Sequence, residues 1–176
     1  MLEIVIPDSE FYNSGTREFV TIKGQTLQLE HSLLSLSKWE AKWHKPFLTQ
    51  DNKSRDELLS YYQCMTITKN VDPLVYSVIP LSEQKRIQVY INDPMTATTV
   101  KKPSHNSSRD VITSELIYFW MITLEIPFEC EKWHLNRLLT LIQVCDIKNA
   151  PSKKMSKKDI FSQNRALNAS RKARRR

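Results

Sequence analysis

The stretch VITSELIYFWMITLEIPFECEKWHLNRLLTLIQVC, residues 111–145, carries the two strongest helical patterns of the chain. Apolar residues recur in it every three or four positions, which is the period of a helix with one buried face. Pro127 divides the stretch, because proline ends or kinks a helix. We therefore expect two helices, over 111–125 and 129–147, that pack together as the core of the fold.

Cys130 and His134 lie four residues apart in the second of these helices, so that a thiol and an imidazole on one face could share a metal ion. A zinc site needs three or four protein ligands, and the chain has neither a CxxC pair nor a second paired segment. A Cys–His nucleophilic pair would need an orienting third group and an oxyanion hole. The neighbours favour a packed amphipathic helix instead: Trp133, Leu135, Leu138 and Leu139. We expect no metal, no cofactor and no catalytic residue here.

Three shorter helices are expected upstream. The first covers LSLSKWEAKWHKPF, with Ser35 or Ser37 as its cap and its end before Pro46. The second begins at Ser54, because Glu57 three residues later completes a capping box. The third covers 82–93, with Ser82 as its cap. Trp39 and Trp43 alternate with lysines, as in a base-stacking surface, but their spacing favours one buried stripe.

The N-terminal region is expected to form strands. LEIVI (2–6) and EFVTIK (18–23) are rich in β-branched and aromatic residues and flank the turn-prone segment 7–16, which predicts a hairpin or, with 26–32, a three-stranded element. Residues 96–110 are polar and indicate a surface loop. The fold class is thus mainly α (α+β), with a β element over 1–34, a helical core domain over 35–148 and a basic helical extension over 149–176.

The net charge of +7 is distributed unevenly along the chain. Residues 148–176 carry eleven Lys or Arg and one acid, a net of +10, so residues 1–147 carry a net of −3. The extension, with the capping pair Ser156 and Asp159 and a weak apolar stripe, is predicted to be helical. Its basic residues are the candidate partner-binding residues: Lys153, Lys154, Lys157, Lys158, Arg165, Arg171, Lys172, Arg174, Arg175 and Arg176. The alternatives are an acidic protein partner, a nucleic-acid backbone and a solubilising tail.

Composition excludes several classes of protein. Gly15 and Gly24 are the only glycines, too few for phosphate-binding loops, dinucleotide turns or nucleophile elbows. Three dispersed cysteines argue against a disulfide framework. No secretory signal is visible, and the longest apolar run, 116–124, is far shorter than the roughly 20 residues of a membrane span. A non-enzymatic protein of a reducing cytoplasm, without membrane insertion, is expected.

Several segments together resemble the tail assembly chaperones of long-tailed bacteriophages. They are TLQLEHSLLSLSKWEAKWHKPF, YYQCMTITKNVDP, DPMTATT, the stretch 112–145 and KKMSKKD with NRALNASRK, and they cover nearly the whole chain in order. The resemblance implies a protein of the host bacterial cytoplasm that binds the tape measure protein, keeps it soluble and promotes assembly of tail-tube subunits around it. It also implies absence from the mature virion, and it is compatible with a homo-oligomer. The alternative is a virion structural or nucleic-acid-contacting phage protein that uses the basic extension.

Overall fold

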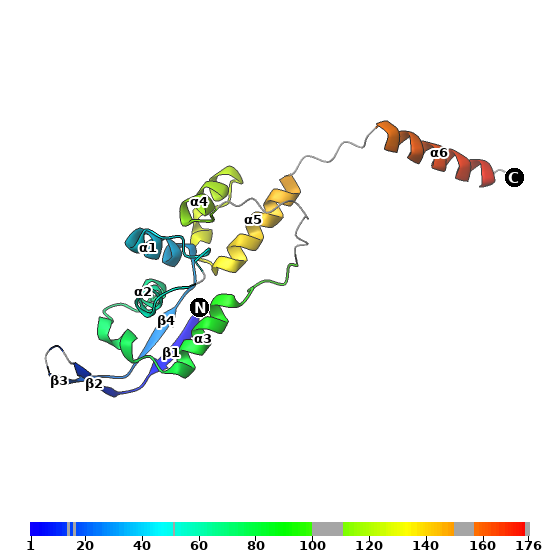
Figure 1. Cartoon of the computed structure of the whole chain (residues 1–176). Helices are drawn as coiled ribbons and strands as arrows, with labels where there is room; N and C mark the ends of the chain where they lie inside the picture. Colours follow the sequence, from blue (N-terminus) through cyan, green and yellow to red (C-terminus); the bar gives the residue numbers. More distant parts are fainter. Residues whose placement is uncertain (14, 16, 51, 100–110, 150–156, 175–176) are drawn as a thin grey trace. The chain divides into compact units, whose positions relative to one another are not determined.

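A computed structural model of the chain describes residues 1–13, 15, 17–50, 52–99, 111–149 and 157–174. The fold is mainly α-helical with a small β part, as the sequence predicts. The chain divides into two compact units, Met1–Asp146 and Ile147–Arg176. The strands and the hydrophobic core belong to the first unit, and the last helix belongs to the second (Figure 1).

The described elements follow one another along the chain as in Figure 1. They are β1 (Leu2–Ile6), β2 (Ser9–Asn13), β3 (Glu18–Ile22), β4 (Gln25–Leu29), α1 (Leu33–Trp43), α2 (Arg55–Met65), the 3₁₀ helix η1 (Pro73–Val78), α3 (Leu81–Asn92), α4 (Ser114–Thr123), the 3₁₀ helix η2 (Phe128–Lys132), α5 (Leu135–Asn149) and α6 (Lys157–Arg174). The segment predicted as a loop has no regular structure over 96–99, and its remainder lies outside the described residues.

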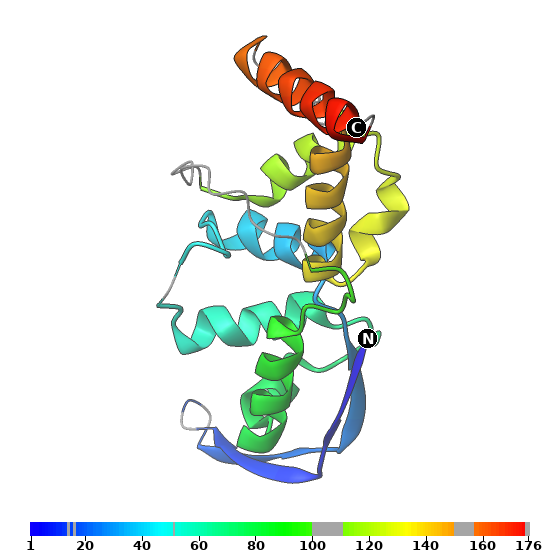
Figure 2. The ribbon, with the colours of Figure 1, turned by 90° about the vertical axis from the view of Figure 1, so that its right-hand side faces the viewer.

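The four strands form one bent antiparallel hairpin, visible as the long ribbon in Figure 2. β1 pairs with β4 and β2 with β3 in a single continuous register, in which Leu2 faces Leu29 and Ser9 faces Ile22. The predicted pairing of 2–6 with 18–23 is therefore wrong, and much of the expected turn is strand β2. The ribbon bends at Gly24, whose N–H donates to Asp8 Oδ1 at 2.6 Å. A Cβ there would lie 2.8 Å from the carbonyl oxygen of Ile6, so the bend requires glycine.

The helix starts follow their capping residues to different degrees. Ser54 and Glu57 form the predicted capping box of α2. Helix α1 begins earlier than expected, because Ser32 is its cap and Ser35 occupies the third position of a capping box. Helix α3 has no side-chain cap and follows Pro80, so that the predicted cap Ser82 lies inside the helix.

The core of the first unit lies between the inner face of the β1–β4 ribbon and the helices. Its fully buried members include Ile4, Leu27, Leu33, Leu36, Trp39, Tyr61, Ile87, Ile117, Met121, Leu135 and Leu138. Helix α1 is central and contacts both α2 and α4. Trp39 is buried and donates to the carbonyl of Glu57 at 2.8 Å, and Trp43 donates to Ser60 Oγ at 3.0 Å. The packing interpretation of these tryptophans is thus confirmed.

The expected core pair of 111–125 and 129–147 is wrong in two respects. The main helix contacts are those of α1 with α2 and α4, whereas α4 and α5 border an open groove. In addition, α5 begins at Leu135 rather than at 129, because residues 128–132 form η2. Between α4 and η2, Glu125 adopts a left-handed conformation (φ 55°). The N–H of Ile126 then bonds to the Met121 carbonyl at 2.8 Å, and η2 follows.

The start of α4 is fixed by a buried carboxylate. Glu40 of α1 accepts from the N–H of Ser114 at 2.7 Å through one oxygen and from the N–H of Phe47 at 3.0 Å through the other. A negative charge at a helix N-terminus satisfies an unpaired N–H and interacts favourably with the helix dipole. This contact positions α4, and with it the groove described next.

Candidate protein-binding groove

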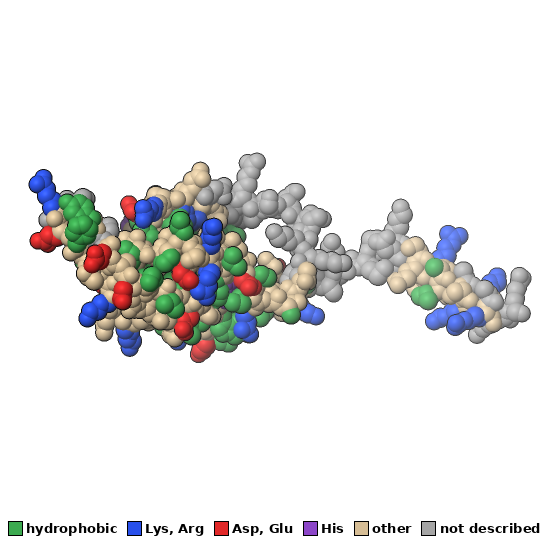
Figure 3. All heavy atoms as spheres, turned by 90° about the horizontal axis from the view of Figure 1, so that it is seen from below, with side chains coloured by type: hydrophobic (Ala, Val, Ile, Leu, Met, Phe, Trp, Pro, Cys, Tyr) green, Lys and Arg blue, Asp and Glu red, His purple; other side chains and the backbone are tan. Residues whose placement is uncertain are grey.

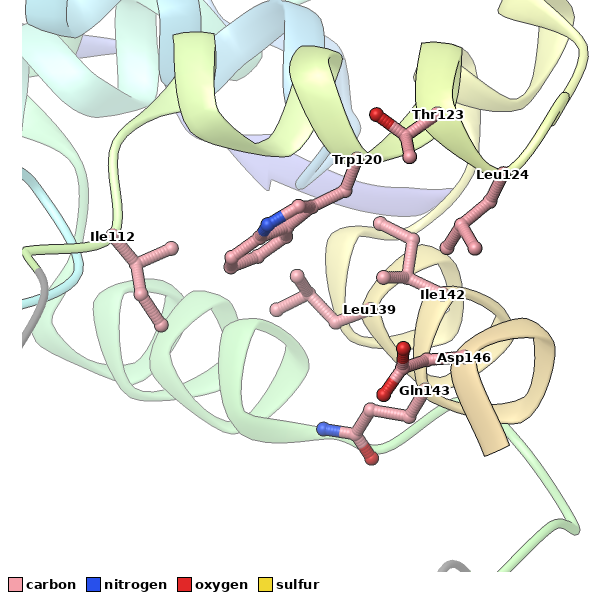
Figure 4. A pocket seen from close by; sticks show the side chains of 8 residues that line it. All are labelled: Ile112, Trp120, Thr123, Leu124, Leu139, Ile142, Gln143 and Asp146. Atoms are coloured by element: carbon pink, nitrogen blue, oxygen red, sulfur yellow. The ribbon is translucent and has the colours of Figure 1, made fainter. Parts of the chain in front are cut away.

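A groove of about 420 Å³ lies between α4 and α5 (Figure 4). Trp120 and Thr123 come from α4, Leu124 follows the last residue of that helix, and Ile112 comes from the segment before it. Helix α5 supplies the other side, with Leu139, Ile142, Gln143 and Asp146. The indole of Trp120 extends toward Ile112 and Leu139 (Figure 4). The groove is therefore apolar along most of its length, with three polar groups: a hydroxyl on α4 and an amide and a carboxylate on α5.

The groove side chains are placed by helical periodicity. On α4, Ile117 and Met121 are fully buried, and Trp120 and Leu124 on the adjacent face are half-buried. On α5, Leu135 and Leu138 enter the core, and the next face carries the half-buried Leu139. Each helix thus has one apolar face in the core and a second apolar face toward the groove. Trp120 on this second face packs against the edge of the core and lines the groove.

The outer face of α4 is apolar as well. Phe119 and Ile122 are about 59% and 62% exposed, and Phe128 of η2 is 55% exposed. The ring of Tyr118 lies 6.4 Å from that of Phe128, between centroids, and its hydroxyl donates to Glu131 at 2.9 Å. Partial burial and Glu131 raise the pKa of Tyr118 to about 12, which keeps the hydroxyl protonated as a donor. A helix that is apolar on every side is normally enclosed, so this exposed face indicates a binding surface.

Cys130 and His134 do not share a helical face. Cys130 lies in η2, and His134 lies just before α5, opposite Ser32 in an isolated β-bridge. Burial, with Glu129 nearby, raises the pKa of the Cys130 thiol and keeps it protonated. His134 donates from Nε2 to the carbonyl of Tyr90 at 2.9 Å and accepts at Nδ1 from the N–H of Asn136 at 3.3 Å. Both ring nitrogens therefore have backbone partners, and neither lone pair is available to a metal.

Two further findings concern the described residues alone. No group of three or more His, Cys, Asp or Glu among them is placed to hold a metal ion. No described helix has the length and apolarity needed to cross a membrane.

The candidate residues of the basic extension lie only partly within the described structure. Arg165, Arg171, Lys172 and Arg174 are exposed on α6, and Figure 3 shows the basic side chains along this helix. Lys157 and Lys158 belong to its first turn. The others lie outside the described residues, as does the predicted cap Ser156: Lys153, Lys154, Arg175 and Arg176.

Comparison of the chain with protein-family models, with curated proteins and with solved structures finds no significant similarity in any of the three. The groove and the α6 surface are therefore interpreted from their own chemistry.

The sequence contained a signal for the groove. LIYFWMI, residues 116–122, is continuously apolar, which is more than one buried helix face requires. The residues on the α5 side gave no such signal, because an apolar side chain that lines a groove and one that fills a core follow the same period.

Proposed function

We propose that the chain is a non-enzymatic assembly chaperone that binds an apolar helical segment of a client protein in the groove between α4 and α5. The observation that carries the proposal is the groove itself, whose lining is apolar except at Thr123, Gln143 and Asp146. An amphipathic helix binds such a groove through residues spaced three, four and seven positions apart. The exposed face formed by Phe119, Ile122 and Phe128 adds apolar area for a long client.

The resemblance to phage tail assembly chaperones suggests the client. A tape measure protein is long and largely helical, and its apolar stripes are exposed until tail-tube subunits enclose it. Such exposed stripes aggregate, so a small protein that covers them keeps the chain soluble. Trp120 is suited to anchor this contact, because large aromatic side chains in grooves dominate binding energies.

The test is binding of the full chain to helical segments of the tape measure protein encoded by the same phage, measured by calorimetry. Trp120→Ala should weaken binding by about thirtyfold or more, the loss expected when a central anchor worth about 2 kcal/mol is removed. Phe19→Ala is the control, because Phe19 is also exposed (74%) but lies on β3. Unchanged affinity of the folded Trp120→Ala protein would refute the proposal.

A second readout is the solubility of the co-expressed tape measure protein. The unmodified chain and the Phe19→Ala protein should keep the client in the soluble fraction, and the Trp120→Ala protein should not. If the client is equally soluble with all three proteins, the surface of the chain that binds it does not include Trp120.

A further inference from the structure

Helix α6 segregates its side chains around its axis. It has 18 residues and is therefore about 27 Å long. Asn164 and Asn168, four residues apart, fall on one face because successive residues turn by about 100°. The same spacing places Arg165 and Lys172 on one flank of this asparagine row and Arg174 on the other, beside Leu167. Arg171, seven residues after Asn164, falls nearly in line with the row itself.

The opposite face of α6 is different. Ala166, which is exposed, falls there by its spacing, so that this face carries a small apolar side chain in place of the asparagines. Around the row, Asn168 borders a polar hollow together with Arg171, Lys172 and Arg174. Phe161, near the N-terminal end of the row, is 77% exposed.

We propose that α6 binds double-stranded DNA, with the Asn164–Asn168 row facing the major groove and the flanking Arg and Lys residues on the phosphates. The major groove of B-form DNA is about 12 Å wide and admits one α-helix. Asparagine is the residue that pairs with adenine edges there, and arginine bonds to phosphates or guanine through a fork of N–H donors. This inference rests on α6 alone and is independent of the function proposed for the groove.

An acidic protein is the competing partner for the same charges. Such a partner would use the lysines and arginines but has no particular use for two asparagines at their centre. Base edges do, because asparagine offers both a donor and an acceptor. The groove geometry also selects among nucleic acids, since the major groove of A-form RNA is deep and too narrow for side chains to read.

The first experiment measures fluorescence anisotropy of a labelled 20-base-pair DNA duplex with the full chain at 50, 100 and 200 mM NaCl. Four phosphate contacts predict a slope of about −4 in log affinity against log salt, and a loss of on the order of a hundredfold over this range. The double variant Arg171→Ala and Arg174→Ala should make the slope shallower by about 2. Absence of binding at 50 mM NaCl, or an unchanged slope in this variant, would overturn the inference.

Two single variants test which face of α6 contacts DNA. Asn168→Asp and Ala166→Asp change the net charge equally but lie on opposite sides of the helix. Asn168→Asp should weaken binding by about tenfold or more, and Ala166→Asp should change it much less. The control variant is Ala166→Asp. Because aspartate is a poorer helix former than alanine, any loss of helix would weaken DNA binding of this control and so work against the expected difference. If the two variants weaken DNA binding equally, α6 attracts DNA through its net charge alone and presents no preferred face to it.

Competitors decide the class of partner. An unlabelled DNA duplex should displace the probe, whereas an RNA duplex and poly-glutamate at equal charge concentration should displace it much less. Equal competition by poly-glutamate would assign α6 to acidic proteins, and equal competition by RNA would exclude insertion into the major groove.

Discussion

The side chain and backbone of Glu57 connect three segments of the first unit. Its Oε1 accepts from Lys45 Nζ at 2.6 Å, its Oε2 accepts from the N–H of Ser54 at 2.7 Å, and its carbonyl accepts from Trp39. The hydrogen bond from Lys45, followed by that from Ser54, lowers the pKa of Glu57 from 4.5 to about 2. The capping box made the bond to Ser54 predictable, but the bond to Lys45 depends on how α1 packs against α2.

We predict that Glu57 makes the protein acid-sensitive. Its pKa is lower in the folded state, so its contribution to stability is fully present above about pH 4.5 and is lost as the pH falls toward 2. Glu57→Gln should lower the urea midpoint at pH 7 and flatten its pH dependence between pH 5 and 2.5. The exposed Glu3→Gln serves as the control and should leave both unchanged. Parallel pH profiles of the Glu57 variant and the unmodified protein would contradict this role.

His31 is a second titratable residue in the core. It is 2% exposed, its Nδ1 is 2.6 Å from the hydroxyl of Tyr61, and its ring centroid is 5.1 Å from that of His134. Burial, and to a smaller extent His134, lowers the pKa of His31 from 6.5 to about 3. The folded protein therefore holds His31 neutral at every pH above this value.

We predict that His31 reduces stability at mildly acidic pH. The unfolded chain binds a proton at His31 below about pH 6.5 and the folded chain does not, so stability falls as the pH decreases from 7 toward 3. Between pH 7 and 5 this loss is about 2 kcal/mol. His31→Gln should remove that part of the pH dependence in urea unfolding. In an NMR titration of the unmodified protein, a His31 ring signal that shifts with a midpoint near pH 6.5 would contradict the prediction.

At the scale of the elements, the sequence correctly predicted a helix boundary where the residues of one short segment determine it. Ser54 with Glu57 correctly located the start of α2, and Pro46 correctly marked the end of α1. The strand pairing was missed because it depends on a bend at Gly24, where the partner, Asp8, is sixteen residues away. The start of α5 was missed because apolar periodicity continues through 128–134, whereas long-range bonds from His134 hold that segment out of the helix.

The distinction between core and groove predicts different costs for two large side chains. Leu138 of α5 is fully buried, so Leu138→Ala should destabilise the protein by about 2–5 kcal/mol. Trp120 is only partly buried and borders the open groove, so Trp120→Ala leaves no closed cavity and should cost less than Leu138→Ala. Urea unfolding of both variants measures the difference. A larger loss of stability for Trp120→Ala than for Leu138→Ala would show that Trp120 is a core residue and not an anchor of the groove.

At the scale of the whole molecule, each unit carries one of the two proposed activities: client binding in the first unit and DNA binding in the second. Truncation after Asn149 removes ten basic residues and one acid, which changes the formal charge from +7 to −2. It leaves α5 and the core of the first unit intact. The apolar residues lost with α6 include Phe161 and Leu167, which are 77% and 48% exposed, so little buried area is removed. We predict a cooperative thermal transition with a nearly unchanged midpoint.

The same truncated protein distinguishes the uses of the two surfaces. DNA binding should be abolished, because the asparagine row and its flanking bases are gone. Binding of the tape measure helix should persist at the same affinity in 200 mM salt, because the apolar groove lies within Met1–Asp146 and salt screens only charges. If truncation instead slows association with the tape measure protein and removes its salt dependence, α6 steers an acidic client, and the DNA inference is replaced by that role. Parallel melting, anisotropy and calorimetry on the truncated and full chains give all three results from one pair of proteins.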